Sequence, residues 1–431
     1  MTIVRDELQL MKRSWVTDLI AGVTVAIVAL PLALGFGITS GAGAGSGLAT
    51  AIIAGLVAAV LGGSRFQVSG PTGAMTVILV PIIASYGIGV LFAVCLVSGV
   101  ILVLLSFLKA GRLMERIPWS VAEGFTLGIA LVIAIQQLPL TLGVPKGEGN
   151  ETLIIAVNTI GHAFSDGVAL SVVGFTVATL AIKIAWSKLN TRLNWRYSIP
   201  ASAVAVIVVT VVAQVAHADV PTIGAINSRD VFHLNISWPG INTGQLLYFA
   251  VMIALLGGVE ALLAARVADN MYSARHHYEA GAQAPHHRPN RELFGQGMAT
   301  MVSGFFGGMP STGAIARTGV NVHAGAQTRL AAIVHALTLV VFVFALAPLV
   351  ALIPTAVLAG VLLGTSWRIA NPHSIRENWK TTRVNQVAYL VTAIGVVAID
   401  LIWGTVIGVL VYIVGNRLAN QRSKSAKSKT P

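Results

Sequence analysis

The tripeptide Thr-Gly-Ala occurs twice in this sequence of 431 residues, and each copy opens a short apolar run after a Gly-Gly pair and a polar break. If each run is a helix, its first backbone N–H groups lack helical partners, and the helix dipole adds about half a positive charge there. Helix starts of this kind bind anions without a cationic side chain. We therefore predict an anion site formed by Thr72, Gly73 and Ala74 in the first copy and by Gly313, Ala314, Ile315 and Ala316 in the second.

Small residues at these positions also have a purely structural interpretation, because Gly and Ala allow membrane helices to pack closely. Arg317, about one turn into the second run, favours the functional interpretation. A cation inside a membrane is costly unless it is paired or contacts a passing anion. We predict that Arg317 contacts the anion. The structural alternative is an ion pair between Arg317 and an acid such as Glu260 or Glu123.

Glu260 is the second intramembrane charge, and four apolar or small residues stand on either side of it in LLGGVEALLAARVADN. A carboxyl group in such surroundings could carry a proton together with the anion, so we predict proton coupling at Glu260. A structural salt bridge is the alternative. Glu123 lies nearer a span end and is expected to have an interfacial or packing role. Asp269 and Asp400 are expected at helix ends near solvent.

Other residues near the two runs predict local structure. Pro31 is expected to kink the first span and expose backbone toward a cavity, with Phe36 as part of the cavity wall. Pro71 suits the first turn of a helix, and Ser69 and Ser311 are candidate N-caps.

The composition requires most of these elements to face lipid. Hydrophobic residues make up 55% of the chain and charged residues only 10%, whereas a soluble domain carries about 25% charged residues. A single cysteine, Cys95, excludes intramolecular disulfides and two-cysteine zinc or redox motifs. His276, His277, His286 and His287 are interpreted as part of a solvated basic loop rather than a metal site. Catalytic motifs such as nucleophile elbows and phosphate-binding loops are absent from the sequence, so neither an enzyme nor a cofactor nor a metal is expected.

A helix that spans a membrane needs about 20 apolar residues. The apolar segments of this sequence predict an all-α polytopic protein of about fourteen spans. The segments that begin near Pro71 and Ser311 are too short to cross alone. The predicted segments are 16–38, 47–63, 71–85, 88–108, 118–142, 167–186, 198–217, 245–265, 295–308, 311–323, 328–352, 355–367, 384–400 and 402–416.

Basic residues predict the orientation of these spans. All but four of the 28 lysines and arginines fall on the side of the N-terminus. Lys146, Arg229 and Arg329 are assigned to the opposite face, and Arg317 lies within the apolar region. Because cytoplasmic loops carry the excess of Lys and Arg, both termini are predicted to be cytoplasmic, in the inner (plasma) membrane. The net charge of +12 is thereby attributed to membrane orientation and not to nucleic-acid binding.

The segments 56–77 and 301–320 form an internal repeat, since each contains a helix ending in Gly-Gly, a polar break and Thr-Gly-Ala. Seven spans, an odd number, precede the second half, so the two halves must be inverted in the membrane. Secondary transporters built in this way bind substrate near the midplane, where discontinuous helices meet. The predicted organisation is a cytoplasmic segment 1–14, repeats at 15–217 and 245–416, an extracytoplasmic loop 218–244 and a basic cytoplasmic tail 417–431.

The stretches 29–77, ALPLALGFGITSGAGAGSGLATAIIAGLVAAVLGGSRFQVSGPTGAMTV, and 295–322, GQGMATMVSGFFGGMPSTGAIARTGVNV, resemble the SulP family of sulfate permeases and related anion transporters. The resemblance covers essentially the whole chain. It implies a core domain of spans one to four and eight to eleven and a gate domain of spans five to seven and twelve to fourteen. It also implies transport of sulfate, bicarbonate, chloride or dicarboxylates by dimers with an elevator-like motion. The anion is implied at the starts of the third and tenth spans, and Arg317 matches an arginine of sulfate-transporting members.

Two departures from the family pattern affect the interpretation. The family usually continues into a cytoplasmic STAS domain, whereas this chain is expected to end in a Lys- and Ser-rich tail soon after its last span. Sodium-coupled bicarbonate members place an aspartate where this chain has Glu260, and hydroxyl residues where it has Ala264 and Ile315. An apolar pair offers sodium no oxygen ligands, so proton coupling is predicted over sodium coupling.

The predicted function is proton-coupled symport of sulfate or a similar small inorganic oxyanion by a homodimer in the lipid bilayer. Bicarbonate uptake by the same fold is the first alternative. A nucleobase–proton symporter would share the inverted architecture, but its sites use carboxylates to read an uncharged base, and Arg317 argues against it. An uncoupled anion channel or a membrane sensor is a further alternative.

Overall fold

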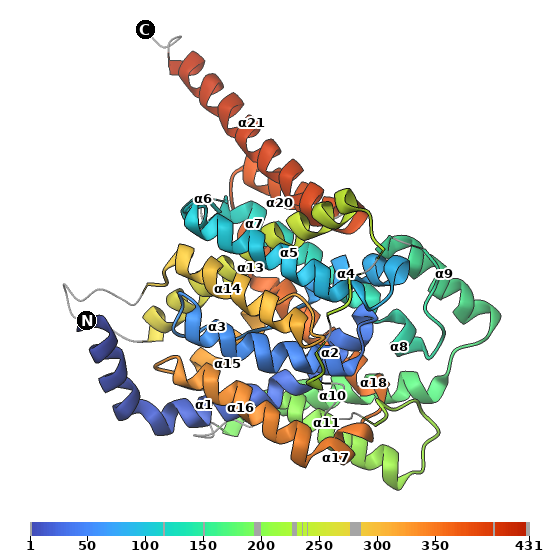
Figure 1. Cartoon of the computed structure of the whole chain (residues 1–431). Coiled ribbons are helices and arrows are strands. Elements are labelled where there is room, and N and C mark those ends of the chain that lie inside the picture. Colours follow the sequence, from blue (N-terminus) through green and yellow to red (C-terminus); the bar gives the residue numbers. More distant parts are fainter. Residues whose placement is uncertain are drawn as a thin grey trace.

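The computed structural model describes residues 2–114, 117–149, 151–193, 200–225, 231–234, 236–238, 240–275, 286–399 and 401–427. Helices form nearly all of its regular structure (Figure 1). The elements of the first half are α1 (Thr2–Ser40), α2 (Ala44–Ala49), a π-helical turn η1 (Thr50–Ala54), α3 (Gly55–Leu61), β1 (Ser69–Gly70), α4 (Gly73–Tyr86), α5 (Val90–Phe107), α6 (Gly111–Met114), α7 (Trp119–Gln136), α8 (Leu138–Leu142), α9 (Thr152–Ser165), α10 (Leu170–Leu193) and α11 (Ala201–Val215). Those of the second half are α13 (Thr243–Arg275), α14 (Pro289–Phe305), β2 (Thr312–Gly313), α15 (Ile315–His323), α16 (Leu330–Ala345), α17 (Ala347–Ala351), α18 (Thr355–Ala370), α19 (Pro372–Asn378), α20 (Arg383–Ala398) and α21 (Leu401–Lys427). Several residues named above, Arg229, His276, His277 and Asp400, lie outside the described ranges.

The helices agree with the predicted all-α membrane architecture. Among the described residues, six helices are long and apolar enough to cross a membrane, and several shorter apolar helices accompany them. Fourteen spans result when α2, η1 and α3 are taken as one and α6, α8, α9, α17 and α19 as connections. Helix α9 was not predicted, because its 14 residues are too short for a span and only one of its faces is apolar.

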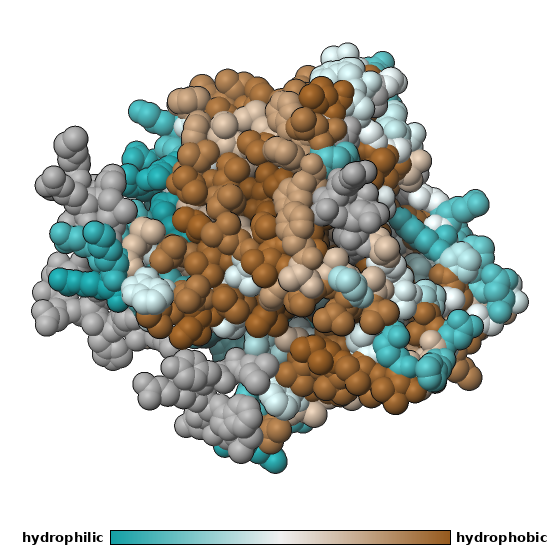
Figure 2. All heavy atoms as spheres, turned by 60° about the horizontal axis from the view of Figure 1, so that its bottom comes forward, coloured by the Kyte–Doolittle hydropathy of each residue, from teal (hydrophilic) through white to brown (hydrophobic). Residues whose placement is uncertain are grey.

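A wide apolar surface covers the middle of the molecule. Figure 2 shows it on one face as a continuous hydrophobic region with hydrophilic residues toward both ends. Large side chains such as Leu104 on α5 and Val341 on α16 are more than half exposed. Exposed apolar area of this extent suits contact with lipid chains and not with water.

A short antiparallel sheet joins the two halves of the chain. Ser69 pairs with Gly313 and Gly70 with Thr312. Helix α4 begins at Gly73 and α15 at Ile315, directly after the paired strands. Because the strands run in opposite directions, the two helices start next to each other and lead away in opposite directions. With 14 and 9 residues, they are about 21 and about 14 Å long, well short of the roughly 30 Å of a hydrocarbon core.

The predicted helix caps are wrong. Ser69 belongs to β1, Ser311 precedes β2, and the N-cap positions are occupied by Thr72 and Ala314 without a side-chain cap hydrogen bond. Pro71 therefore precedes α4 and is not in its first turn. Strand pairing keeps these residues extended, so each helix begins later than its sequence suggested.

Each polar break is held by a side chain from the other half of the chain. Glu292 of α14 is buried and accepts hydrogen bonds from the backbone N–H groups of Gly63 (2.7 Å) and Ser64 (2.9 Å) and from Gln67 Nε2 (2.9 Å). In the opposite sense, Thr50 Oγ1 of η1 accepts from the backbone N–H of Met309 (2.6 Å). The two breaks are thus fixed reciprocally, each by the long span of the other repeat.

Helices α1 to α5 and α13 to α16 pack mainly on one another, and so do α7 to α11 and α18 to α21. We call the first group the core domain and the second the gate domain, in agreement with the predicted division. The two domains meet where α1 packs against α18 and α11 and where α4 packs against α7. The starts of α4 and α15 belong to the core domain.

Arg329 corrects one part of the predicted orientation. Its Nε donates to Glu7 Oε1 (2.9 Å) and its Nη1 to the carbonyl of Gly62 (2.7 Å), so it lies on the side where the N-terminal part of α1 begins. Its assignment to the opposite face was wrong. The reason is that α15 starts inside the molecule and leads the chain back toward the N-terminal side (Figure 1).

We expect Glu292→Ala to destabilise the protein by about 2–4 kcal/mol, because several buried donors lose their acceptor at once. The check is the apparent melting temperature of the detergent-purified protein, compared with Glu148→Ala, which removes an exposed carboxylate. A melting temperature equal to that of the wild type would show that the break is held without Glu292.

Candidate functional site

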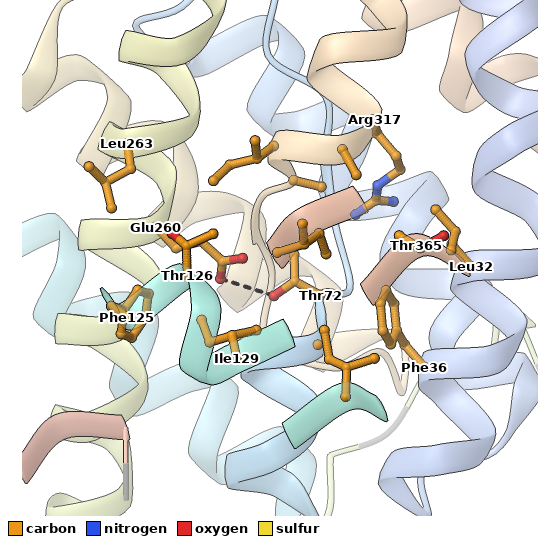
Figure 3. Close-up of a pocket in the computed structure, with 16 residues that line it drawn as sticks. Leu32, Phe36, Thr72, Phe125, Thr126, Ile129, Glu260, Leu263, Arg317 and Thr365 are labelled. Atoms are coloured by element: carbon orange, nitrogen blue, oxygen red, sulfur yellow. Dashed lines mark hydrogen bonds between the residues drawn. The ribbon is translucent and has the colours of Figure 1, made fainter. Parts of the chain in front are cut away.

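A cavity of about 50 Å³ lies between the core and gate domains at the starts of α4 and α15 (Figure 3). Most of the residues predicted to bind substrate line it: Phe36, Thr72, Gly73, Ala314, Ile315, Ala316 and Arg317, together with Glu260. Ala74 and Gly313 do not. Ala74 is fully buried behind the cavity wall, and Gly313 lies in β2, where a Cβ would come within 1.8 Å of Gln67 Nε2.

The first turns of α4 and α15 supply backbone donors. The first N–H with a partner inside its own helix belongs to Thr76 in α4 and to Thr318 in α15. The helical pattern therefore leaves the preceding three N–H groups of each helix without an intrahelical acceptor. The N–H of Ala314 is not available, because it donates to the carbonyl of Val68 (3.0 Å). Of the residues predicted for the second run, Ile315 and Ala316 therefore have N–H groups without an intrahelical acceptor, and Arg317 supplies the third such group in place of Ala314.

Gly73 stands where α7 of the gate domain packs against the start of α4. A Cβ at this position would lie 2.2 Å from Cδ1 of Ile133, a residue of α7. Only glycine leaves room here for the start of α4 to face the cavity while α7 packs across it.

Arg317 is almost completely buried at 1% exposure, and its side chain reaches the cavity from the third residue of α15 (Figure 3). Its Nη2 donates to the carbonyl of Pro71 (2.8 Å), and its Nη1 has no hydrogen-bond partner. No ion pair within 4.0 Å joins Arg317 to Glu260 or Glu123. A buried guanidinium with an unused donor is costly unless an anion takes that donor.

Glu260 of α13 is buried in the wall of the same cavity. Its Oε2 accepts a hydrogen bond from the hydroxyl of Thr72 (3.0 Å), which is the N-cap residue of α4 (Figure 3). The carboxyl group thereby contacts the start of a helix whose first N–H groups have no intrahelical acceptor. This contact was not predicted, because no spacing in the sequence connects residues 188 positions apart.

The remaining cavity residues come mainly from the gate domain and were missed by sequence reasoning. They are Leu32, Phe125, Thr126, Ile129, Ile133, Leu263, Thr365 and Ile369. Those on α7 and α18 belong to apolar spans that no internal repeat marks, and the charged residues of these spans, Glu123 and Arg368, do not line the cavity.

Glu123 and Asp269, the other acids named in the sequence analysis within the described ranges, do not line the cavity. Glu123 accepts a hydrogen bond from the hydroxyl of Ser374, in keeping with the predicted packing role. Asp269 was predicted near solvent and His287 in a solvated loop, and both predictions were wrong. Asp269 is buried, and its carboxylate pairs with Nδ1 of His287 (2.7 Å). Within the described residues, no group of three or more His, Cys, Asp or Glu side chains gathers to hold a metal ion.

Comparison with known proteins agrees with this architecture. The model of the "Sulfate permease family" matches residues 16–392. A Bacillus subtilis protein named "Putative sulfate transporter YvdB" is 33% identical over 92% of this chain and 72% of its own length. The bicarbonate transporter BicA of Synechocystis is 30% identical over 95% of this chain and 72% of its own length.

Solved structures agree as well. The transmembrane domain of a cyanobacterial BicA superposes with a TM-score of 0.77 at 28% identity, over 93% of this chain and 98% of that one. SLC26A9 shares the fold, with a TM-score of 0.78 at 17% identity over 94% of this chain and 65% of that one. The all-helical fold of two inverted seven-span repeats, the matched family model and the curated relatives lead to one conclusion: the chain is an anion transporter that belongs to the sulfate permease family.

Proposed function

We propose that the protein takes up sulfate or a similar small oxyanion by symport with a proton. The observation that carries this proposal is the buried guanidinium of Arg317, which has one nitrogen, Nη1, without a hydrogen-bond partner. Arg317 lines the same cavity as Glu260. The charges support a divalent substrate. Arg317 contributes one positive charge and the two helix starts about half a charge each, which together balance a dianion when Glu260 is protonated.

Thr72 connects the proton to the anion. While Glu260 is ionised, its Oε2 accepts a hydrogen bond from the hydroxyl of Thr72 (3.0 Å). Once Glu260 is protonated it becomes a donor and can donate to Thr72, and the hydroxyl of Thr72 is then free to donate to an anion at the start of α4. Proton uptake thus removes a negative charge from the cavity and supplies one further donor.

The two domains provide a route for alternating access. In this proposal the core domain, which carries the Thr72, Glu260 and Arg317 groups, moves as a unit against the gate domain. Both termini face the cytoplasm of the inner membrane, the repeats extend over 15–217 and 245–416, and two copies form the transporter. The excess of basic residues on the side of the N-terminus supports this orientation.

Bicarbonate is the second candidate, because two relatives are named bicarbonate transporters. A monoanion balances the site charge while Glu260 stays ionised, so its transport would need no proton at this residue. Sodium coupling has weak support, since Ala264 and Ile315 have apolar side chains without oxygen atoms. A nucleobase symporter is disfavoured by the same guanidinium, and an uncoupled channel would leave the proton acceptor without a role.

Uptake into proteoliposomes tests the substrate and the coupling together. We expect labelled sulfate to accumulate under an inward proton gradient, with sulfate analogues competing more strongly than bicarbonate. Saturable bicarbonate uptake that ignores both the proton gradient and sulfate would establish the second candidate. A steady, non-saturating anion current would establish a channel.

Arg317→Ala should lower sulfate uptake by about a hundredfold or more, because the cavity wall loses the cationic residue that would contact the anion. Arg317→Lys should recover only part of the activity, since an ammonium lacks the planar guanidinium geometry. Arg376→Ala, which removes an exposed arginine of α19, is the control. Near wild-type uptake by a folded Arg317→Ala protein would make the arginine structural.

Glu260→Gln should retain sulfate binding but lose the response of uptake to a proton gradient, because the amide can still contact Thr72 but cannot exchange a proton. Initial uptake rates between pH 5 and pH 8 provide the measurement. Glu123→Gln is the matched control and should keep the pH response of the wild type. A pH response that survives in Glu260→Gln would place the proton elsewhere.

A further inference from the structure

Lys183 places a second cation next to the cavity, in the gate domain. It lies in the middle of α10, where a charge is costly unless it has a partner. Its ammonium donates to the carbonyl of Val361 (3.0 Å) and to Thr365 Oγ1 (3.2 Å), both on α18. Gly364 makes this approach possible, because a Cβ there would meet Nζ at 2.9 Å and Cδ at 3.0 Å.

Thr365 is the acceptor of this ammonium and also a cavity residue. It is 2% exposed, and its side chain lies in the wall of the cavity that contains Arg317 (Figure 3). Its hydroxyl donates a hydrogen bond to the carbonyl of Val361 (2.8 Å). The same carbonyl also accepts from Lys183, so it remains hydrogen-bonded if the hydroxyl turns away from it.

We propose that Lys183 and Thr365 form a gate-side arm of the anion site. In this arm the Thr365 hydroxyl donates a hydrogen bond to the bound oxyanion, while the hydroxyl oxygen accepts one from the Lys183 ammonium. This inference rests on the proposed function of anion transport. A hydroxyl that accepts from a cation is a stronger donor than an isolated one, because hydrogen bonds in a chain polarise one another. The positive charge thereby acts on the anion without entering the cavity.

The arm gives the site donors on both sides of the domain boundary. Arg317 and the two helix starts belong to the core domain, and Thr365 belongs to the gate domain. An oxyanion that contacts both holds the domains together in the closed arrangement, and a movement of the core domain takes the anion away from Thr365. Affinity should therefore depend on the position of the core domain.

Equilibrium binding of labelled sulfate to the purified protein tests the arm. We expect Lys183→Met and Thr365→Val each to weaken binding by about tenfold, and the double variant to be little weaker than either, because the two residues act as one unit. Thr176→Val is the matched control: its buried hydroxyl also joins α10 to α18, through the carbonyl of Ala356 (3.2 Å), but Thr176 does not line the cavity. It should change binding by less than about twofold.

Lys183→Arg and Thr365→Ser are the controls for misfolding, because each retains a cation or a hydroxyl at its position. Each should bind sulfate with an affinity within about threefold of the wild type. Binding by Lys183→Met equal to that of the wild type, or losses that add in the double variant, would overturn the arm. Arg317→Ala separates the two proposals. If it abolishes binding while Lys183→Met does not, anion transport stands and the arm fails. If the wild type binds another oxyanion in place of sulfate, the sulfate assignment fails, and the same variants measured with that oxyanion decide on the arm.

Discussion

Pairing of four residues, Ser69 and Gly70 with Thr312 and Gly313, is the constraint on which the site depends. It brings together two segments that are more than 240 positions apart and makes both adjacent helices start at the same place. A helix that starts inside a membrane exposes N–H groups that lipid cannot satisfy. The fold accepts this cost only because the starts face a cavity, where an anion can take the unused donors.

The long spans on either side keep that pairing in place. Glu292 of the second half binds the break after α3, and Thr50 of the first half binds the break after α14. Thr50 belongs to a π-helical turn, a feature that often marks functional positions in helices. Because each repeat fixes the break of the other, the starts of α4 and α15 are held in place from both halves of the core domain.

Charge is distributed unequally across the boundary between the domains. The core domain has both the guanidinium of Arg317 and the carboxyl group of Glu260 in the cavity wall, whereas the gate domain presents mostly apolar side chains such as Phe125 and Ile129. The gate side of the cavity wall therefore offers the core domain few polar partners. Thr365 is the gate residue in the cavity wall whose hydroxyl is in contact with a cation.

The sequence alone determined the parts of this protein that are encoded locally. Hydropathy and length defined the spans, and the two Thr-Gly-Ala copies with Arg317 and Glu260 indicated an anion site, because an isolated charge in an apolar run needs a function wherever it folds. Only the tertiary structure decided which groups meet. It showed that strand pairing displaces the helix starts and that the N–H of Ala314 donates to the carbonyl of Val68. It also showed that Glu260 contacts Thr72 and that α18 completes the cavity. Those contacts join residues far apart in the chain, and neither periodicity nor composition contains information about such distances.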